Sequence, residues 1–146
     1  MLAELGAELS LWKVNMKPGK PVAIARLGDT PYYGLPGNPV SAMVAFLLFV
    51  RPSIRTALGC AQPFDLPRAT AILDGPVRAK GNRRSYLRGH ATFDATGTLR
   101  VAPKPHQGSH ILTSMVSANA LIVLEPGPHD LSAGSPVTIQ LIAPLG

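Results

Sequence analysis

The chain has 146 residues, of which 46% are apolar and 5% aromatic, a composition that suits one ordinary domain or two small ones and argues against disorder. Its longest unbroken apolar run, Ala42 to Val50, has nine residues, whereas a membrane-spanning helix needs roughly 20, so we expect no membrane partner. The single Cys60 permits no internal disulfide, and the first residues lack a secretory signal. These features predict a cytoplasmic location.

Fourteen Lys+Arg against eight Asp+Glu give the chain a net charge of +6. When the chain is divided at Gly59, each half carries +3. This even, modest excess favours small anionic ligands about as well as nucleic acid, because no basic tail concentrates the charge.

The first elements along the chain are short. Leucines recur at helical spacing in residues 2–9, with two glutamates on the other side, which predicts the last turns of an amphipathic helix. Such a short helix is marginal without tertiary support, so we expect the chain to begin within a larger architecture. Strands are expected at Leu11–Val14, Val22–Leu27 and Tyr32–Leu35.

The strongest local signal is GLPGNPVS (Gly34–Ser41), which leads into the apolar stretch Ala42–Val50. Asn38 suits an N-cap and Pro39 suits the first helical position. We expect this helix to run to about Arg51, to bend or restart at Pro52 and to stop at Gly59.

The start of this helix is a candidate anion site. An open helix N-terminus presents unpaired backbone N–H groups and a partial positive charge. Gly37 would allow close backbone approach to a ligand, and Ser41 would add a hydroxyl donor. The alternative is a well-capped structural helix that binds nothing.

A second candidate anion site is the segment KVNMKPGKP (Lys13–Pro21), which has three lysines. The Pro18-Gly19 turn would direct Lys17 and Lys20 toward one point. In α/β sheets, ligands gather beyond the carboxyl ends of the strands, where this turn and the start of the helix both lie. A solvated basic loop is the alternative.

After the helix, the two prolines of Cys60–Pro67 predict a linker. We therefore divide the chain into an α/β part at residues 1–59, a linker at 60–68 and an all-β part at 69–146. The last part consists of short β-type runs between turns, which predict a small antiparallel barrel or sandwich. These runs are Ala69–Leu73, Ser85–Thr92, Thr98–Pro103, Ala120–Leu124 and Val137–Ile142.

The all-β part also holds candidate anion-binding residues. Arg83 and Arg88 could bind phosphate through their planar guanidinium groups, although a regular strand would point them to opposite faces. Ser109 could offer a hydroxyl. A basic strand edge that discourages aggregation is the alternative, and nucleic-acid binding is less favoured because the segment has one aromatic, Tyr86.

No metal site is expected in this chain. His106 and His110 have the spacing of a helical ligand pair, but Gly108 and nearby prolines argue against a helix.

Two motifs in order, KVNMKPGKP and GLPGNPVSAMVAFLLFVRP (Gly34–Pro52), resemble the molybdopterin molybdenumtransferase family, called MoeA in bacteria and represented by the gephyrin E domain in animals. RRSYLRG (Arg83–Gly89) and SHILTSMVSANALIVLEP (Ser109–Pro126) are similar to the C-terminal domain of that family. The resemblance covers essentially the whole chain and corresponds to the C-terminal portion of a full-length member.

The resemblance implies a fold and a reaction. The fold is the C-terminal part of a three-layer α/β domain followed by a small β-barrel. The reaction is the insertion of molybdate into adenylylated molybdopterin, by a cytoplasmic homodimer with Mg²⁺. A glycine-rich acidic segment expected upstream is absent, and the Mg²⁺ ligands belong to earlier domains, so the isolated chain is expected to be inactive or severely impaired.

The resemblance also implies roles for individual residues. Lys13 and Lys17 would be catalytic, and no residue of this chain would bind metal. The substrate-binding residues would be Lys20, Pro36, Gly37, Asn38, Pro39, Ser41, Arg83, Arg88 and Ser109. A non-catalytic molybdopterin-binding or protein-interaction module is the alternative, since the animal relative is also a receptor-clustering scaffold.

Overall fold

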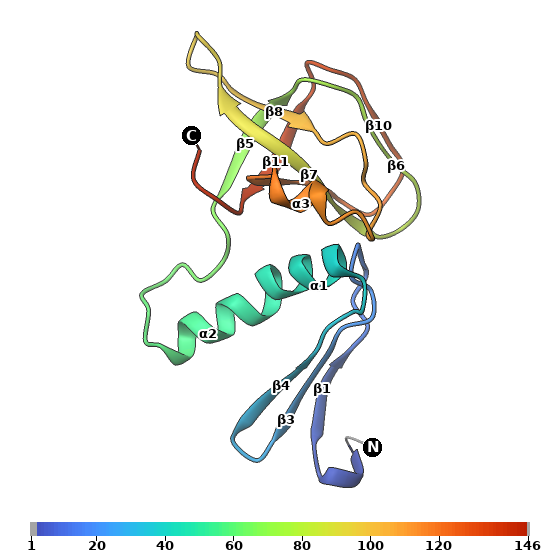
Figure 1. Ribbon diagram of the computed structural model, residues 1–146, viewed down its shortest axis with the longest axis vertical. Coiled ribbons are helices and arrows are strands. Elements are labelled where there is room, and N and C mark those ends of the chain that lie inside the picture. Colours follow the sequence, from blue (N-terminus) through green and yellow to red (C-terminus); the bar gives the residue numbers. More distant parts are fainter. Residues whose placement is uncertain (1–2, 146) are drawn as a thin grey trace.

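The first part of the chain forms a three-stranded antiparallel sheet that leads into one long helix (Figure 1). The computed structural model describes residues 3–145. The sheet has the strand order β1-β3-β4, and β3 pairs with both neighbours. These strands are β1 (Glu8–Trp12), β3 (Ala23–Leu27) and β4 (Thr30–Gly34).

The helix predicted for residues 2–9 is wrong over most of its length. The described residues form only the 3₁₀ turn η1 (Ala3–Leu5) before β1 begins at Glu8. Gly6 has φ +76° and ends the turn, and Glu8 then pairs with Arg26 of β3. The ladder of backbone hydrogen bonds to β3 therefore outweighs the helical spacing of the leucines; Leu2 lies outside the described residues.

The predicted long helix is present and contains a wide turn. It consists of α1 (Pro39–Ala45), the π-helix η2 (Phe46–Val50) and α2 (Arg51–Ala57). Pro52 lacks an N–H group and its ring would crowd the carbonyl four residues earlier, which explains the wider turn in front of it. The predicted stop at Gly59 is confirmed, because Gly59 has φ +67° and its N–H donates to the Thr56 carbonyl at 3.0 Å.

The helix is longer than the nine-residue apolar run on which the expectation of no membrane span was based. Residues Pro39–Ala57 form 19 helical residues with a mean hydropathy of 1.4, long and apolar enough by those measures alone to cross a membrane. A core helix of a water-soluble protein passes the same test, so one such helix is weak evidence for a membrane span. Only 22% of that window is buried, so much of its apolar surface is uncovered.

The second part of the chain is a closed five-stranded barrel. Its strands follow the order β7-β8-β5-β11-β9, and pairing of β9 with β7 closes the ring. One of these pairings, β5 with β8, is parallel, which the antiparallel prediction did not include. The strands are β5 (Arg68–Leu73), β7 (Arg84–Phe93), β8 (Leu99–Pro103), β9 (Ala120–Leu124) and β11 (Pro136–Leu141).

Four short elements were not predicted, because two to four residues carry too little periodicity to be recognised. Two of them, β6 (Val77–Ala79) and β10 (His129–Leu131), form a two-stranded sheet beside the barrel. The others are β2 (Met16–Lys17) and the one-turn helix α3 (Thr113–Val116).

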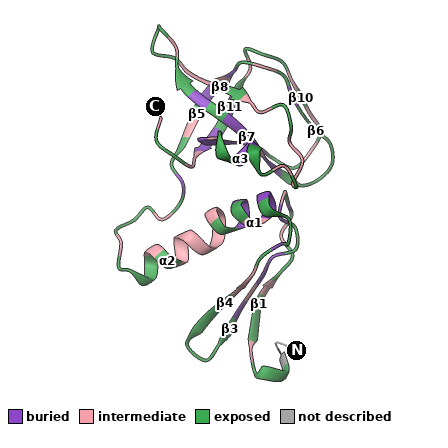
Figure 2. Ribbon diagram, in the orientation of Figure 1, coloured by how far each residue is buried: buried purple, intermediate pink, exposed green. Residues whose placement is uncertain are grey.

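Two clusters of buried side chains hold these parts together. One fills the barrel and includes the fully buried Leu73, Ile122 and Ile139. The other joins the start of the long helix to the outside of the barrel, through Val44 of α1 and Met115 of α3. Figure 2 shows this pattern, with buried residues in the barrel strands and at the start of α1, intermediate and exposed ones on α2, and exposed ones at the far end of the β3–β4 hairpin. The second cluster fixes the N-terminus of α1 against the barrel.

Candidate functional site

The lysine-rich hairpin is tied directly to the barrel. Its short strand β2 pairs in parallel with the start of β7, which places Lys17 opposite Ser85. Asn15 strengthens the connection, because its side-chain amide donates to the Asn82 carbonyl at 2.7 Å and its own carbonyl accepts from the Arg84 N–H at 3.1 Å. The hairpin therefore belongs structurally to both parts of the chain.

The turn of this hairpin also packs on the first turn of α1. Gly19 has φ +103°, a backbone conformation that glycine adopts without strain. A Cβ atom at this position would lie 2.6 Å from the Met16 Cε and 3.5 Å from the Ser41 carbonyl oxygen. The close approach of Gly19 brings Lys17 and Lys20 to the N-terminal end of α1.

The N-terminus of α1 meets a loop of the barrel part. Asn38 occupies the predicted N-cap position, but its side chain makes no capping bond. Instead its Nδ2 donates to the Ser109 Oγ at 3.3 Å, and the Val40 N–H donates to the Ser109 carbonyl at 3.3 Å. One of the N–H groups expected to be open for a ligand is therefore already bonded to the protein.

Arg88 holds this loop in place. The side chain is 1% exposed, and its guanidinium donates to the Ser114 Oγ at 3.1 Å and to the carbonyls of His106 and Gly108 at 3.3 and 3.2 Å. Gln107 adds two bonds to the Arg88 backbone, one in each direction and each 2.9 Å long. Burial lowers the pKa of Arg88, although an arginine stays charged at neutral pH.

The hairpin, α1 and this loop surround a cavity of about 1030 Å³. Seven basic side chains line it, and none of its described lining residues is acidic or a histidine. Half of the fourteen Lys+Arg of the chain thus face one cavity, while its eight Asp+Glu lie elsewhere. The basic lining residues are Lys17, Lys20, Arg78, Lys80, Arg83, Arg88 and Lys104.

The net charge of +6 is therefore far less evenly distributed in space than along the chain. Arg78 has a carboxylate partner, Asp130, whereas Lys17, Lys20, Lys80 and Arg83 have no ion pair within the described part of the chain. Clustered cations without counter-charges repel one another. A bound anion would reduce this repulsion and would be attracted by the cations.

Seven of the eleven residues singled out from the sequence line the cavity. They are Lys17, Lys20, Asn38, Ser41, Arg83, Arg88 and Ser109. The hypothesis that the lysine turn and the start of the helix converge agrees with this geometry. Their roles toward a ligand remain predictions.

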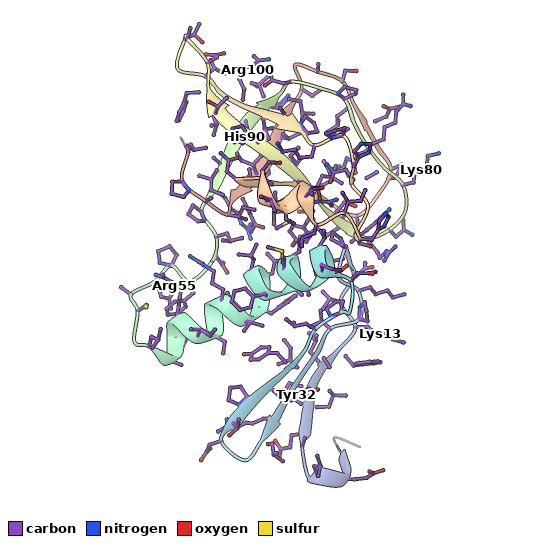
Figure 3. All side chains as sticks on the ribbon, viewed as in Figure 1. Lys13, Tyr32, Arg55, Lys80, His90 and Arg100 are labelled. Atoms are coloured by element: carbon purple, nitrogen blue, oxygen red, sulfur yellow. The ribbon has the colours of Figure 1, made fainter. Side chains whose placement is uncertain are left out.

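The other four, Lys13, Pro36, Gly37 and Pro39, are not among the lining residues. The backbone of Lys13 has φ +65°, and its Nζ lies 5.7 Å from the centroid of the Trp12 ring, so this side chain is directed toward Trp12. Figure 3 shows Lys13 beside the hairpin, well away from Lys80 on the barrel. Pro36 is buried, and Gly37 and Pro39 are exposed outside the cavity.

Two basic lining residues, Arg78 and Lys104, were missed from the sequence. Lys80 begins the basic segment that contains the candidates Arg83 and Arg88, but it was given no role of its own. Arg78 and Lys104 belong to no motif and lie far apart in the chain, on β6 and after β8. The apolar-polar alternation of Val77–Lys80 was the available signal, and it was too short to identify a strand.

The cavity is suited to holding a large anion by positive charge and fixed donors. It offers no carboxylate or imidazole for general acid–base work among its described lining residues. The described residues also contain no group of three or more His, Cys, Asp and Glu side chains that could hold a metal ion. The cavity lies where the α/β part meets the barrel, and its basic lining is the chemistry of a site for an anionic ligand.

Comparison with known proteins identifies its family. The model of the MoeA C-terminal region (domain IV) matches residues 70–142, and a model described as "Probable molybdopterin binding domain" matches residues 1–56. The chain belongs to the MoeA family.

Individual relatives agree. The chain is 37% identical to the molybdopterin molybdenumtransferase of Haemophilus influenzae over 133 residues, which are 91% of this chain and 33% of the relative. It is 33% identical to molybdopterin molybdenumtransferase 1 of Mycobacterium tuberculosis, covering 100% of this chain and 35% of that protein. A molybdopterin biosynthesis MoeA structure from Pyrococcus horikoshii matches with a TM-score of 0.77 and 28% identity, over 96% of this chain and 33% of that one. The chain spans about a third of the length of these relatives.

Proposed function

We propose that this chain provides the anion-binding cavity for the insertion of molybdate into adenylylated molybdopterin, a step of molybdenum cofactor biosynthesis. The observation that carries the proposal is the cavity itself, where the two motif segments meet and half of the basic side chains of the chain converge. The names of the relatives, molybdopterin molybdenumtransferase, support the same reaction class.

The chemistry of the cavity fits this reaction. Molybdate and the phosphates of the pterin substrate are oxyanions, which need positive groups and hydrogen-bond donors in fixed positions. Lys17 and Lys20 supply charge, and the hydroxyls of Ser41 and Ser109 supply donors beside it. Catalysis by this chain therefore consists of binding and orienting the reactants.

Other parts of the proposal rest on the family resemblance. Mg²⁺ is expected, but a cavity lined by basic residues and no described carboxylate does not fit a divalent cation, and we assign no step to it. A homodimer and a cytoplasmic location are expected likewise. Sedimentation equilibrium of the purified chain measures whether it forms the dimer by itself.

The function is tested by following molybdate-dependent conversion of adenylylated molybdopterin by the purified chain. We expect molybdate binding that Lys17→Ala weakens, with turnover absent or severely impaired in the isolated chain. Arg26→Ala is the matched control, because Arg26 lies on β3 and pairs with the exposed Asp29.

Two results would count against this account. Failure of the wild-type chain to bind molybdate would overturn the proposed function. Turnover at the rate of a full-length relative would contradict the expected need for the acidic segment.

A further inference from the structure

The cavity has two walls with separate sets of cations. The wall formed by the hairpin and α1 carries Lys17 and Lys20. Another part of the lining comes from the barrel part of the chain, in residues 75–80 and 103–105, and carries Arg78, Lys80 and Lys104. We call these three residues the barrel cations. Figure 1 shows their two segments beside each other, with β6 at the edge of the barrel and the chain after β8 descending next to it.

The backbone of β6 fixes the direction of Arg78. Val77 is buried in the barrel core and Ala79 packs partly against it. Because side chains alternate along a strand, Arg78 is directed away from that core, and Lys80 follows directly after the strand and is exposed. Both line the cavity.

Lys104 is anchored at its backbone on both sides. Its N–H donates to the Arg88 carbonyl at 2.9 Å, and its carbonyl accepts from the Gln107 Nε2 at 2.8 Å. Gly75 lies next to this segment, since a Cβ there would be 3.7 Å from the Pro103 Cδ. These bonds fix the backbone of Lys104, and the contact of Pro103 with Gly75 brings this segment close to the turn before β6.

The positive charges of the barrel cations are not neutralised by strong ion pairs in the described residues. Lys80 and Lys104 have no carboxylate partner in the described residues. Arg78 Nε lies 2.9 Å from Asp130 Oδ1, but the two side chains are 75% and 69% exposed, and an exposed ion pair contributes at most about 1 kcal/mol. Arg78 could therefore leave Asp130 and bind a phosphate oxygen at a small cost in free energy.

A single oxyanion would fill only a small part of the cavity. Its volume of about 1030 Å³ lies at the upper end of the roughly 300–1,000 Å³ typical of sites for whole organic ligands. A ligand with anionic groups at two positions would meet both sets of cations.

We propose that Arg78, Lys80 and Lys104 form a second anion subsite that binds a diphosphate group, while Lys17, Lys20 and Ser41 bind the oxyanion to be inserted. The inference rests on the proposed function, because an adenylylated phosphate contains such a diphosphate linkage. Separate subsites would hold the molybdate and the linkage at once, each against its own wall.

The test uses molybdate and inorganic pyrophosphate as separate probes, with affinity measured by isothermal titration calorimetry. We expect the two probes to bind together without competition. The double variant Lys80→Ala/Lys104→Ala should weaken pyrophosphate binding by at least about tenfold, since it removes two hydrogen bonds to charged groups. Its effect on molybdate should be several times smaller because the charges are farther away and screened by salt.

The reciprocal variant and a control complete the design. Lys17→Ala/Lys20→Ala should weaken molybdate binding more than pyrophosphate binding. Arg26→Ala/Arg68→Ala removes the same number of charges at exposed positions outside the cavity lining and should leave both affinities near wild type.

Different results would refute the second subsite and the proposed function. Mutual displacement of the two probes, or unchanged pyrophosphate affinity in Lys80→Ala/Lys104→Ala, would overturn the second subsite while molybdate binding stands. A wild-type chain that binds pyrophosphate through Lys80 and Lys104 but binds no molybdate would support the subsite and overturn the proposed function.

Discussion

At the scale of single residues, Gly19 is the position on which the lysine turn depends. Its positive φ strains any residue with a side chain, and a Cβ there would force the end of the buried Met16 side chain to move. The turn is consequently pressed against α1, and Lys17 and Lys20 share a cavity with Ser41. Gly19 thus contributes to the convergence of these groups, together with the pairing of β2 with β7.

We predict that Gly19→Ala destabilises the protein by about 1–3 kcal/mol, because the added methyl strains the backbone and collides with the Met16 side chain. Urea unfolding followed by circular dichroism measures this loss. Molybdate affinity should fall as well, since the displaced turn carries both lysines.

Gly37→Ala is the matched control for this prediction. A Cβ at Gly37 meets nothing within 4 Å, so this substitution should change the free energy of unfolding by no more than about 0.5 kcal/mol. Equal destabilisation by the two substitutions would contradict the role given to Gly19.

At the scale of elements, Arg88 connects strand β7 to the loop in front of α3. The sequence suggested that Arg88 binds substrate, but three of its hydrogen bonds are to protein acceptors. We interpret it as a positioning residue, which keeps Ser109 against the N-terminus of α1 through the loop between them. Its contribution to a ligand site would then be indirect.

Arg88→Met is expected to cost about 2–4 kcal/mol of stability, because it leaves buried acceptors without their charged donor. Arg84→Met on the same strand should cost less than about 1 kcal/mol, since the Arg84–Glu125 ion pair is exposed. Denaturant unfolding of both variants compares the two losses.

Hydrogen exchange separates positioning from general destabilisation. The Val40 N–H donates to the Ser109 carbonyl, so it should exchange faster in Arg88→Met once the loop is released. Retention of the wild-type exchange rate at Val40 under native conditions would argue against the positioning role.

At the scale of the whole molecule, the ligand cavity exists only because two parts of the chain are joined. The parallel pairing of β2 with β7 and the second buried cluster hold the hairpin and α1 against the barrel. The lining then takes residues from positions 17 to 109 of the sequence. Neither part alone carries both sets of cations.

This construction explains what the sequence could and could not reveal. The barrel strands, β3, β4 and the N-cap position of Asn38 follow from local pattern and were predicted, whereas the strand expected at Leu11–Val14 is β1 at Glu8–Trp12. Lys17 and Lys20 were found because they form a motif, whereas Lys80 and Lys104 become neighbours only through the barrel. The direction of Lys13 toward Trp12 depends on one positive φ value, which residue pattern does not encode.

The crystal structure of the chain soaked in molybdate, with anomalous scattering measured at the molybdenum absorption edge, tests the central claim most directly. We predict a single strong anomalous peak inside the cavity, within hydrogen-bonding reach of Lys17, Lys20 and Ser41. A peak on another face, or no peak at millimolar molybdate with the cavity open to solvent, would contradict the account.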